Sequence, residues 1–218
     1  MIVVHHLENS RSQRILWMLE ELGVDYEVRQ YQRDPKTNLA PASLENVHPL
    51  GKSPVITDGD DVIAESGNII EYLAVKYGKD GWIPAADSPE YWDCKYWLHY
   101  GEGSLMPLLV MKLIFDKVKE SPMPFFVKPV AKGISKKVME AYIGPNLKKN
   151  MNFIEAHLAN RDYFVGDGLT VADIQMCFPL ESAQARYLRG KHYPNITAYV
   201  KRIQALPGYQ RAREKGCV

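Results

Sequence analysis

In the first third of the chain, the spacing of the hydrophobic residues changes between that of a strand and that of a helix. β-Branched residues at 2–4 open it, and a polar turn follows at 8–12. Apolar residues then recur at helical spacing up to Gly23, which is placed as a C-terminal stop. These apolar positions are Ile15, Leu16, Leu19 and Leu22. Tyr26 and Val28 next alternate with charged residues, as in a half-buried strand. The order strand, helix, strand predicts a βαβ unit.

Two further short runs, 55–57 and 62–64, meet across Asp58-Gly59-Asp60-Asp61. An Asp-Gly pair between such runs is typical of a β-hairpin. A helix is predicted from about 67 to 77, because its apolar residues fall on one face. Turn-forming residues at 78–89 then break the pattern. We therefore expect an α/β domain over 1–78, a linker over 79–89 and a second domain over 90–218.

The segment beyond the linker lacks the alternation of a strand. Helical patterns run from 91 to 106, continue after Pro107 to 118, and resume from 132 to 157 after the helix breakers at 121–124. Thr170 and Asp173 have the spacing of a capping box, so a helix should start at Thr170. A last amphipathic helix is predicted from Pro194 and should end before Leu206. The second domain is thus expected to be all-helical.

Composition and charge limit the kinds of partner. The chain is 46% hydrophobic and 24% charged, which is typical of a folded globular protein. Its net charge of +1 gives no field to attract nucleic acid, and its longest apolar run, 105–115, is too short to span a membrane. Residues 1–8 do not resemble a signal sequence. We therefore expect a cytoplasmic protein with no nucleic-acid or membrane partner.

The three cysteines, Cys94, Cys177 and Cys217, are too few and too scattered for a disulfide framework or a metal site. We expect them to be reduced thiols. His5 and His6 are adjacent, but a strand places neighbouring residues on opposite faces, so a shared metal site or acid–base pair is not expected. No metal is therefore predicted.

Three segments of the first domain carry candidate chemistry. The first is 9–14, at the amino end of a predicted helix. Free amides and the helix dipole favour an anion there, such as a phosphate, a carboxylate or a thiolate. The hydroxyls of Ser10 and Ser12 could add a hydrogen bond to that anion, or could simply cap the helix.

The second and third segments flank the predicted hairpin. Pro54 stands directly before a strand, where it either marks the strand start or forms a cis bond that turns free amides toward a ligand. Glu65 and Ser66 stand at a strand-to-helix junction. The carboxylate could bind an ammonium while the hydroxyl and the first helix amides bind a carboxylate, a combination that suits an amino-acid moiety. Alternatively, Ser66 only caps the helix.

In their joint order, these segments resemble the cytosolic glutathione S-transferase family. The resemblance rests on SRSQRILWMLEELG at 10–23, NVHPLGKSPV at 46–55, the Glu65-Ser66 pair, FVGD at 164–167 and LTVAD at 169–173. These runs extend over nearly the whole chain. The resemblance implies an α/β plus all-α architecture, in which an N-terminal thioredoxin-like βαβ-α-ββα domain precedes an all-helical C-terminal domain.

The same resemblance implies a glutathione site. Its binding residues would be Lys52, Ser53, Pro54, Val55, Glu65 and Ser66. Glu65 and Ser66 would hold the amine and the carboxylate of the γ-glutamyl unit. Pro54 would be cis, and the backbone on one side of it would pair with the cysteinyl unit. Lys52 would lie near the glycine carboxylate or the peptide backbone.

The family carries Tyr, Ser or Cys at its thiol-activating position. This chain has no Tyr at the end of its first strand and no cysteine before Cys94, so the resemblance is to a serine-type enzyme of a bacterial or fungal-like kind. Ser10 would donate a hydrogen bond to the sulfur. Asn9 aligns about as well, whereas Ser12 is interpreted as a helix cap.

The resemblance further implies a transferase that ionises the thiol of glutathione and adds it to a small hydrophobic electrophile. Glutathione would be a co-substrate, with no permanently bound cofactor. The electrophile site is expected between the domains with Tyr100 and Met106 on its wall, and the protein is expected to be a homodimer. Two other functions stay open: a non-catalytic ligand-binding or interaction module on the same fold, and a glutathione-dependent peroxidase.

Overall fold

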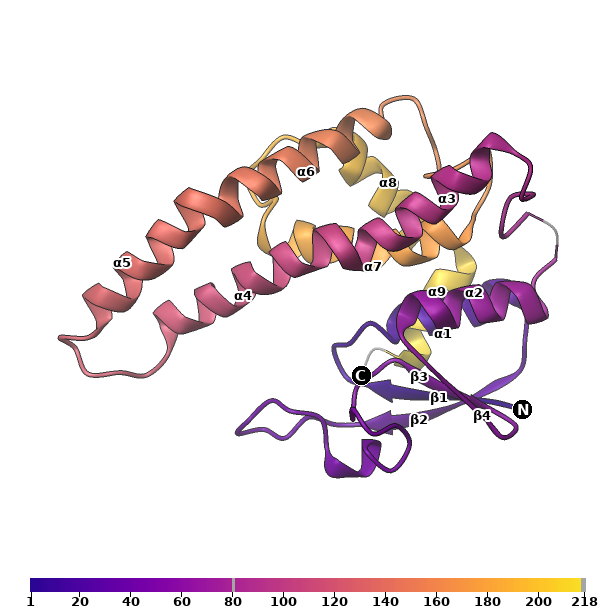
Figure 1. Ribbon diagram of the computed structural model, residues 1–218, viewed down its shortest axis with the longest axis horizontal. Coiled ribbons are helices and arrows are strands. Elements are labelled where there is room, and N and C mark those ends of the chain that lie inside the picture. The colour runs from indigo at the N-terminus through magenta and orange to yellow at the C-terminus, as the bar shows by residue number, and fades with distance from the viewer. Residues whose placement is uncertain (80, 217–218) are drawn as a thin grey trace.

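A computed structural model describes residues 1–79 and 81–216 of the chain. Asp80, inside the predicted linker, and Cys217 lie outside the described residues. The N-terminal part forms one four-stranded mixed sheet of order β2-β1-β3-β4, at the base of Figure 1. Its strands are β1 (Ile2–Leu7), β2 (Tyr26–Tyr31), β3 (Val55–Asp58) and β4 (Asp61–Ala64). β1 pairs in parallel with β2, and the other two pairings are antiparallel.

Two helices, α1 (Gln13–Leu22) and α2 (Ser66–Tyr77), lie between the sheet and the helical part of the molecule (Figure 1). The residues from Ile15 to Leu19 are buried, and α1 ends where Gly23 adopts a left-handed conformation with φ of 64°. A glycine adopts this conformation without a side-chain penalty, which explains the helix stop. Gly59 has φ of 62° in the turn between β3 and β4, so the predicted hairpin is confirmed.

The middle helix of the predicted βαβ-α-ββα order is only a short 3-10 helix, η1 (Ala42–Leu44). Pro35, Pro41 and Pro49 punctuate the segment between β2 and β3. Each proline lacks a backbone N–H and disfavours a helical conformation at the residue before it. A longer helix therefore cannot continue through this segment. The segment instead follows an irregular path that leads to the start of β3.

Every regular secondary-structure element that the structure describes beyond α2 is a helix. Its elements are α3 (Pro89–Tyr100), η2 (Gly101–Leu105), α4 (Met106–Glu120), α5 (Lys128–Val138), η3 (Met139–Ile143), α6 (Gly144–His157), α7 (Val171–Arg186), α8 (Pro194–Gln204) and α9 (Pro207–Gly216). Two long rods, α3–α4 and α5–α6, run side by side and project well beyond the sheet (Figure 1). The second rod begins at Lys128, four residues before the predicted start.

Each rod contains a five-residue π-helical turn, η2 or η3, placed just before a proline. Pro107 and Pro145 occupy the first turns of α4 and α6. A proline cannot donate to the preceding turn and collides with its carbonyl in a regular α-helix. The wider turn therefore lets the rods continue through the two prolines.

Helix α7 begins at the predicted capping box. The Thr170 hydroxyl accepts from a helix amide, and the Asp173 carboxylate accepts from the N–H of Thr170 at 3.0 Å. Asp173 is fully buried and also accepts from the N–H of Phe164 at 2.9 Å and from the hydroxyl of Tyr199 at 3.0 Å. Burial raises the pKa of Asp173 to about 6, and these bonds counteract the shift. The carboxylate therefore joins the loop before α7 to α8.

Helix α8 is not the last helix, contrary to the sequence prediction. Pro207 opens a further helix, α9, instead of ending the chain's helical part. Proline is well suited to a first helical position because its missing N–H is not needed there. The Tyr209 ring of α9 meets the Trp17 ring of α1 edge to face with centroids 5.6 Å apart. The carboxylate of Glu20 pairs with Arg211 at 2.7 Å, so α9 is held against α1.

Within the described residues, Cys94 and Cys177 are free and buried, and burial raises the pKa of both thiols. None of the described helices is long and apolar enough to cross a bilayer. The same residues contain no cluster of three or more side chains of the kinds that hold a metal ion.

We expect Asp173→Asn to lower the free energy of unfolding by at least about 2 kcal/mol. Each oxygen of Asp173 accepts a backbone N–H, so either orientation of an amide would turn its NH2 group toward a donor. Urea unfolding would measure the loss. Asp167→Asn, a change at an exposed position in the same loop, is the control. Equal stability of the two variants would contradict the prediction.

Candidate active site

The segment that leads into β3 turns at a cis peptide bond between Ser53 and Pro54, as predicted. Ser53 is tied to the carboxyl end of β1. Its hydroxyl donates to the carbonyl of His5 at 2.9 Å and accepts from the N–H of Leu7 at 3.3 Å. These two bonds fix the position of Ser53 relative to the first strand.

The junction between β4 and α2 presents a carboxylate and a hydroxyl beside free helix amides. Glu65 is exposed and has φ of 69°, a strained backbone conformation of a kind that clusters at active and binding sites. Ser66 is the first residue of α2 and is buried. No described residue hydrogen-bonds to its hydroxyl, so the alternative that Ser66 only caps the helix is not supported. The first amides of α2 have no partner within the helix and can receive an anion.

These two segments form the walls of one pocket of about 210 Å³. Five of the six residues predicted to bind glutathione line it: Lys52, Ser53, Pro54, Glu65 and Ser66. Val55 does not line the pocket, because it is buried as the first residue of β3 and pairs with β1 and β4. The pocket therefore contains one cation, one anion, two hydroxyls and a helix amino end from the predicted set.

The two candidate thiol donors have different surroundings. Ser10 is buried, and its hydroxyl oxygen lies 3.2 Å from that of Ser53, so it adjoins the pocket through a lining residue. Asn9 is exposed, has φ of 51°, and is not part of the pocket wall. The geometry favours Ser10.

Ser12 does not act as the cap of α1, and its interpretation as a cap is wrong. It stands at the cap position, but its side chain accepts no hydrogen bond from the helix amides. Its hydroxyl lies 2.7 Å from that of Ser10 and 2.8 Å from Nδ1 of His6. A buried imidazole needs a polar partner, and the hydroxyl of Ser12 supplies it.

Five pocket residues were not predicted: Arg11, His48, Leu50, Ala64 and Glu102. Arg11 and His48 lie within the segments that carry the family resemblance, but the resemblance assigns ligand contacts to their neighbours only. Glu102 comes from η2 in the helical part. No local motif marks it, because its role depends on two arginines about 90 positions earlier in the chain.

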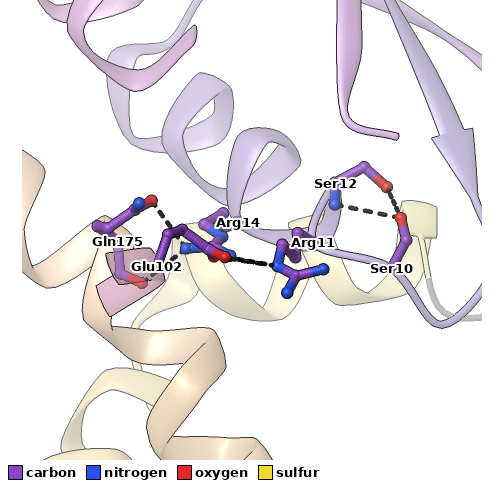
Figure 2. Close-up of polar contacts among 6 residues, drawn as sticks. All are labelled: Ser10, Arg11, Ser12, Arg14, Glu102 and Gln175. Atoms are coloured by element: carbon purple, nitrogen blue, oxygen red, sulfur yellow. Dashed lines mark hydrogen bonds and ion pairs between the residues drawn. The ribbon is translucent and has the colours of Figure 1, made fainter. Parts of the chain in front are cut away.

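Glu102 joins these two arginines (Figure 2). Its carboxylate lies 2.9 Å from Nε of Arg11 and 2.5 Å from Nη2 of Arg14. The guanidinium of Arg14 is buried and also donates to the backbone carbonyl of Gln175 at 2.8 Å and to its side chain at 2.7 Å. The pocket wall thus includes an ion-pair network that connects α1 with η2 and α7.

The neighbouring histidines have structural partners. Nδ1 of His5 lies 2.9 Å from the hydroxyl of Tyr31, and His6 contacts Ser12. Burial lowers the pKa of both imidazoles, and nearby Arg29 lowers that of His5 further. Both shifts favour the neutral form of the ring.

The predicted electrophile residues lie away from this pocket. Tyr100 lines a second pocket of about 530 Å³ between the two rods, and its hydroxyl donates to Asn150. Met106 is buried and lines neither pocket. The two pockets come close at η2, where Glu102 belongs to the first and Gly103 to the second. The assignment of Tyr100 and Met106 to an electrophile site stays a prediction.

Family models and sequence relatives both match this chain. The family model for the N-terminal domain of glutathione S-transferases matches residues 1–75, and the model for the C-terminal domain matches residues 114–207. Glutathione S-transferase 3 of Schizosaccharomyces pombe is 38% identical over 215 residues, which cover 99% of this chain and 88% of the relative. Glutathione S-transferase 1 of Saccharomyces cerevisiae is 35% identical over 222 residues, with coverage of 98% and 94%.

The solved structures give the same result. The crystal structure of a glutathione S-transferase from Actinobacillus pleuropneumoniae is 33% identical and has a TM-score of 0.80, covering 99% of this chain and 93% of that one. The expected thioredoxin-like domain followed by a helical domain is therefore confirmed. The chain belongs to the glutathione S-transferase family.

Proposed function

We propose that this chain is a serine-type glutathione transferase that binds glutathione in the pocket of Glu65 and Ser66 and adds its thiolate to a small hydrophobic electrophile. The observation that carries the proposal is the single pocket that gathers predicted residues from both flanks of the hairpin beside Ser10. The similarity to fungal and bacterial members of the family supports the same assignment.

The charges of the pocket are complementary to those of glutathione. The carboxylate of Glu65 would pair with the γ-glutamyl ammonium, and the hydroxyl of Ser66 with the first amides of α2 would bind the adjacent carboxylate. Lys52 is exposed at the rim and would bind the glycine carboxylate. The backbone around Pro54 would pair with the cysteinyl unit and hold the thiol near Ser10.

The residues around the sulfur favour its ionised form. A free thiol has a pKa of about 8.5, and lowering it by about two units requires roughly 2.7 kcal/mol of preferential stabilisation of the thiolate. A hydrogen bond from Ser10 and the amino end of α1 can together supply this energy. Ser10 therefore acts as a donor to sulfur and forms no covalent bond. The thiol proton leaves to solvent. The thiolate then forms a bond to an electrophilic carbon, and the electron pair of the bond that breaks there departs with the leaving group or takes up a proton from solvent.

The assembly would be a cytoplasmic homodimer, as the family resemblance implies. Large apolar side chains are exposed on the single chain, among them Trp92 on α3 and Ile134 on α5. Where such side chains form a contiguous patch, the surface is typical of one that contacts another chain.

We expect Ser10→Ala to raise the pKa of bound glutathione by about 1 to 2 units, because the thiolate loses a hydrogen bond from a hydroxyl. Ultraviolet titration of the thiolate across pH would measure this shift. Asn9→Ala is the matched control and should leave the pKa near its wild-type value. A shift in Asn9→Ala alone would assign the donor to Asn9. A bound thiol with an unshifted pKa in the wild type would indicate a non-catalytic binding module.

We expect Glu65→Gln and Ser66→Ala each to weaken glutathione binding about tenfold or more. Glu65→Gln removes the negative charge that pairs with the ligand ammonium, and Ser66→Ala removes a hydrogen bond to the ligand carboxylate. Titration calorimetry would measure the affinity, and circular dichroism would check the fold. Asp60→Asn, at the exposed hairpin turn outside the pocket, should bind as the wild type does. Unchanged affinity in both pocket variants would refute the site assignment.

We expect light scattering at micromolar concentration to give twice the mass of one chain. A mass equal to one chain would contradict the homodimer.

A further inference from the structure

A chain of hydrogen-bonding side chains leads from the glutathione pocket into the sheet. The hydroxyl oxygens of Ser53 and Ser10 are 3.2 Å apart, those of Ser10 and Ser12 are 2.7 Å apart, and the oxygen of Ser12 lies 2.8 Å from Nδ1 of His6. Figure 2 shows the middle contact, between Ser10 and Ser12 at the amino end of α1. Three contacts therefore connect a pocket residue to a buried imidazole on β1.

Each hydroxyl has a single proton, so it can donate in only one of its contacts. This limit fixes which group donates in each hydrogen bond. The hydroxyl of Ser53 has a single proton, and it is committed to the carbonyl of His5, which can only accept. In its contact with Ser10, Ser53 must therefore accept. The single proton of Ser10 then points toward Ser53, which lines the pocket.

The single proton of each hydroxyl also fixes the donor in the remaining two contacts. Because the proton of Ser10 points toward Ser53, the short contact between Ser10 and Ser12 requires Ser12 to donate. Ser12 then has no proton left for its contact with His6. Nδ1 of His6 must therefore carry a proton and donate to Ser12. All three hydrogen bonds form together only with this tautomer.

The surroundings of the imidazole agree with that tautomer. Burial lowers the pKa of His6, which favours the neutral ring with a single proton. The carbonyl of Gly216 is close enough to oppose this shift, but Nε2 has no partner in hydrogen-bonding geometry among the described residues. Among the described residues, the contact of His6 that has hydrogen-bonding geometry is that of Nδ1 with Ser12, so the acceptor for the proton lies there.

We propose that His6 is a positioning residue for the thiol donor: its Nδ1–H sets the direction of the Ser12–Ser10 relay, so that the proton of Ser10 points into the glutathione pocket. This inference rests on the proposed function, in which the sulfur of glutathione replaces Ser53 as the acceptor of that proton. The imidazole touches neither glutathione nor the electrophile. It acts by polarising two hydroxyls, since hydrogen bonds in a chain strengthen one another.

The test compares two substitutions of His6 by the pKa of bound glutathione. His6→Phe keeps a ring and removes the donor. It should raise the pKa of bound glutathione by about half a unit, because cooperativity supplies only a fraction of the strength of each hydrogen bond. At a pH well below the pKa of the bound thiol, the corresponding loss in kcat/KM for the electrophile is about threefold, with KM for glutathione unchanged. His6→Asn places an amide donor near the position of Nδ1 and should restore the wild-type pKa.

A double-mutant cycle with Ser10→Ala separates this role from a purely structural one. In the Ser10→Ala background the relay has no terminal donor, so His6→Phe should leave the pKa of the bound thiol unchanged. Equal shifts in both backgrounds, or no shift in either, would overturn the inference. If Ser10→Ala itself does not move the pKa, Ser10 is not the donor, and that result would overturn the proposed function of Ser10 together with the relay.

Ser12→Ala is the second variant, in case the aromatic replacement at β1 prevents folding. It removes the middle of the relay with little change in volume. The bound thiol should again have a raised pKa in the Ser10 background and an unchanged one in the Ser10→Ala background. A wild-type pKa in Ser12→Ala would count against the relay.

Discussion

The buried guanidinium of Arg14 is the constraint on which the site depends. Burial lowers the pKa of Arg14, and the carboxylate of Glu102 opposes that shift most strongly. A charge without solvent requires partners for its donors, and these come from Glu102 on η2 and from Gln175 on α7. The α1 helix of the sheet part is therefore joined to two elements of the helical part. Because Glu102 also lines the pocket, the same network fixes one wall of the proposed glutathione site.

Helix α9 holds α1 from another direction. Tyr209 packs on Trp17, and Glu20 is shared between Arg211 and Lys215. Together with the contacts of α1 to α2 and α7, this arrangement surrounds the helix whose amino end adjoins the pocket. A fixed helix keeps its end amides and dipole in one direction, so they would not need to reorganise for a thiolate bound there as proposed. The C-terminal helix, which lies far from the pocket in sequence, therefore supports the chemistry at the amino end of α1.

Features encoded by local sequence could be predicted, and features that depend on distant partners could not. The strands, the hairpin turn at Gly59, the stop at Gly23 and the cap at Thr170 each follow from residues within one segment. The pairing of Glu65 with Ser66 at a junction was also visible locally.

Other features required the folded chain. Ser12 at a helix start predicts a cap, but a buried imidazole on β1 competes for its hydroxyl. Pro207 predicts a helix end, but the apolar surface of α1 stabilises a further helix that starts there. Glu102 has no local signal, since its partners are about 90 positions away. In each case the deciding contact joins segments that only the tertiary fold brings together.

The pairing of Glu102 explains how a carboxylate can line a pocket that is proposed to stabilise a thiolate. Alone, Glu102 would raise the pKa of a nearby thiol by repulsion between like charges. It is paired with both Arg11 and Arg14, so the three side chains together carry one positive charge. Nε of Arg11 contacts Glu102, and no described residue accepts from its two terminal nitrogens, which Figure 2 shows free of dashed contacts. The buried arginine therefore turns Glu102 from a repulsive neighbour into the group that orients Arg11, and the net field at the amino end of α1 stays favourable for an anion.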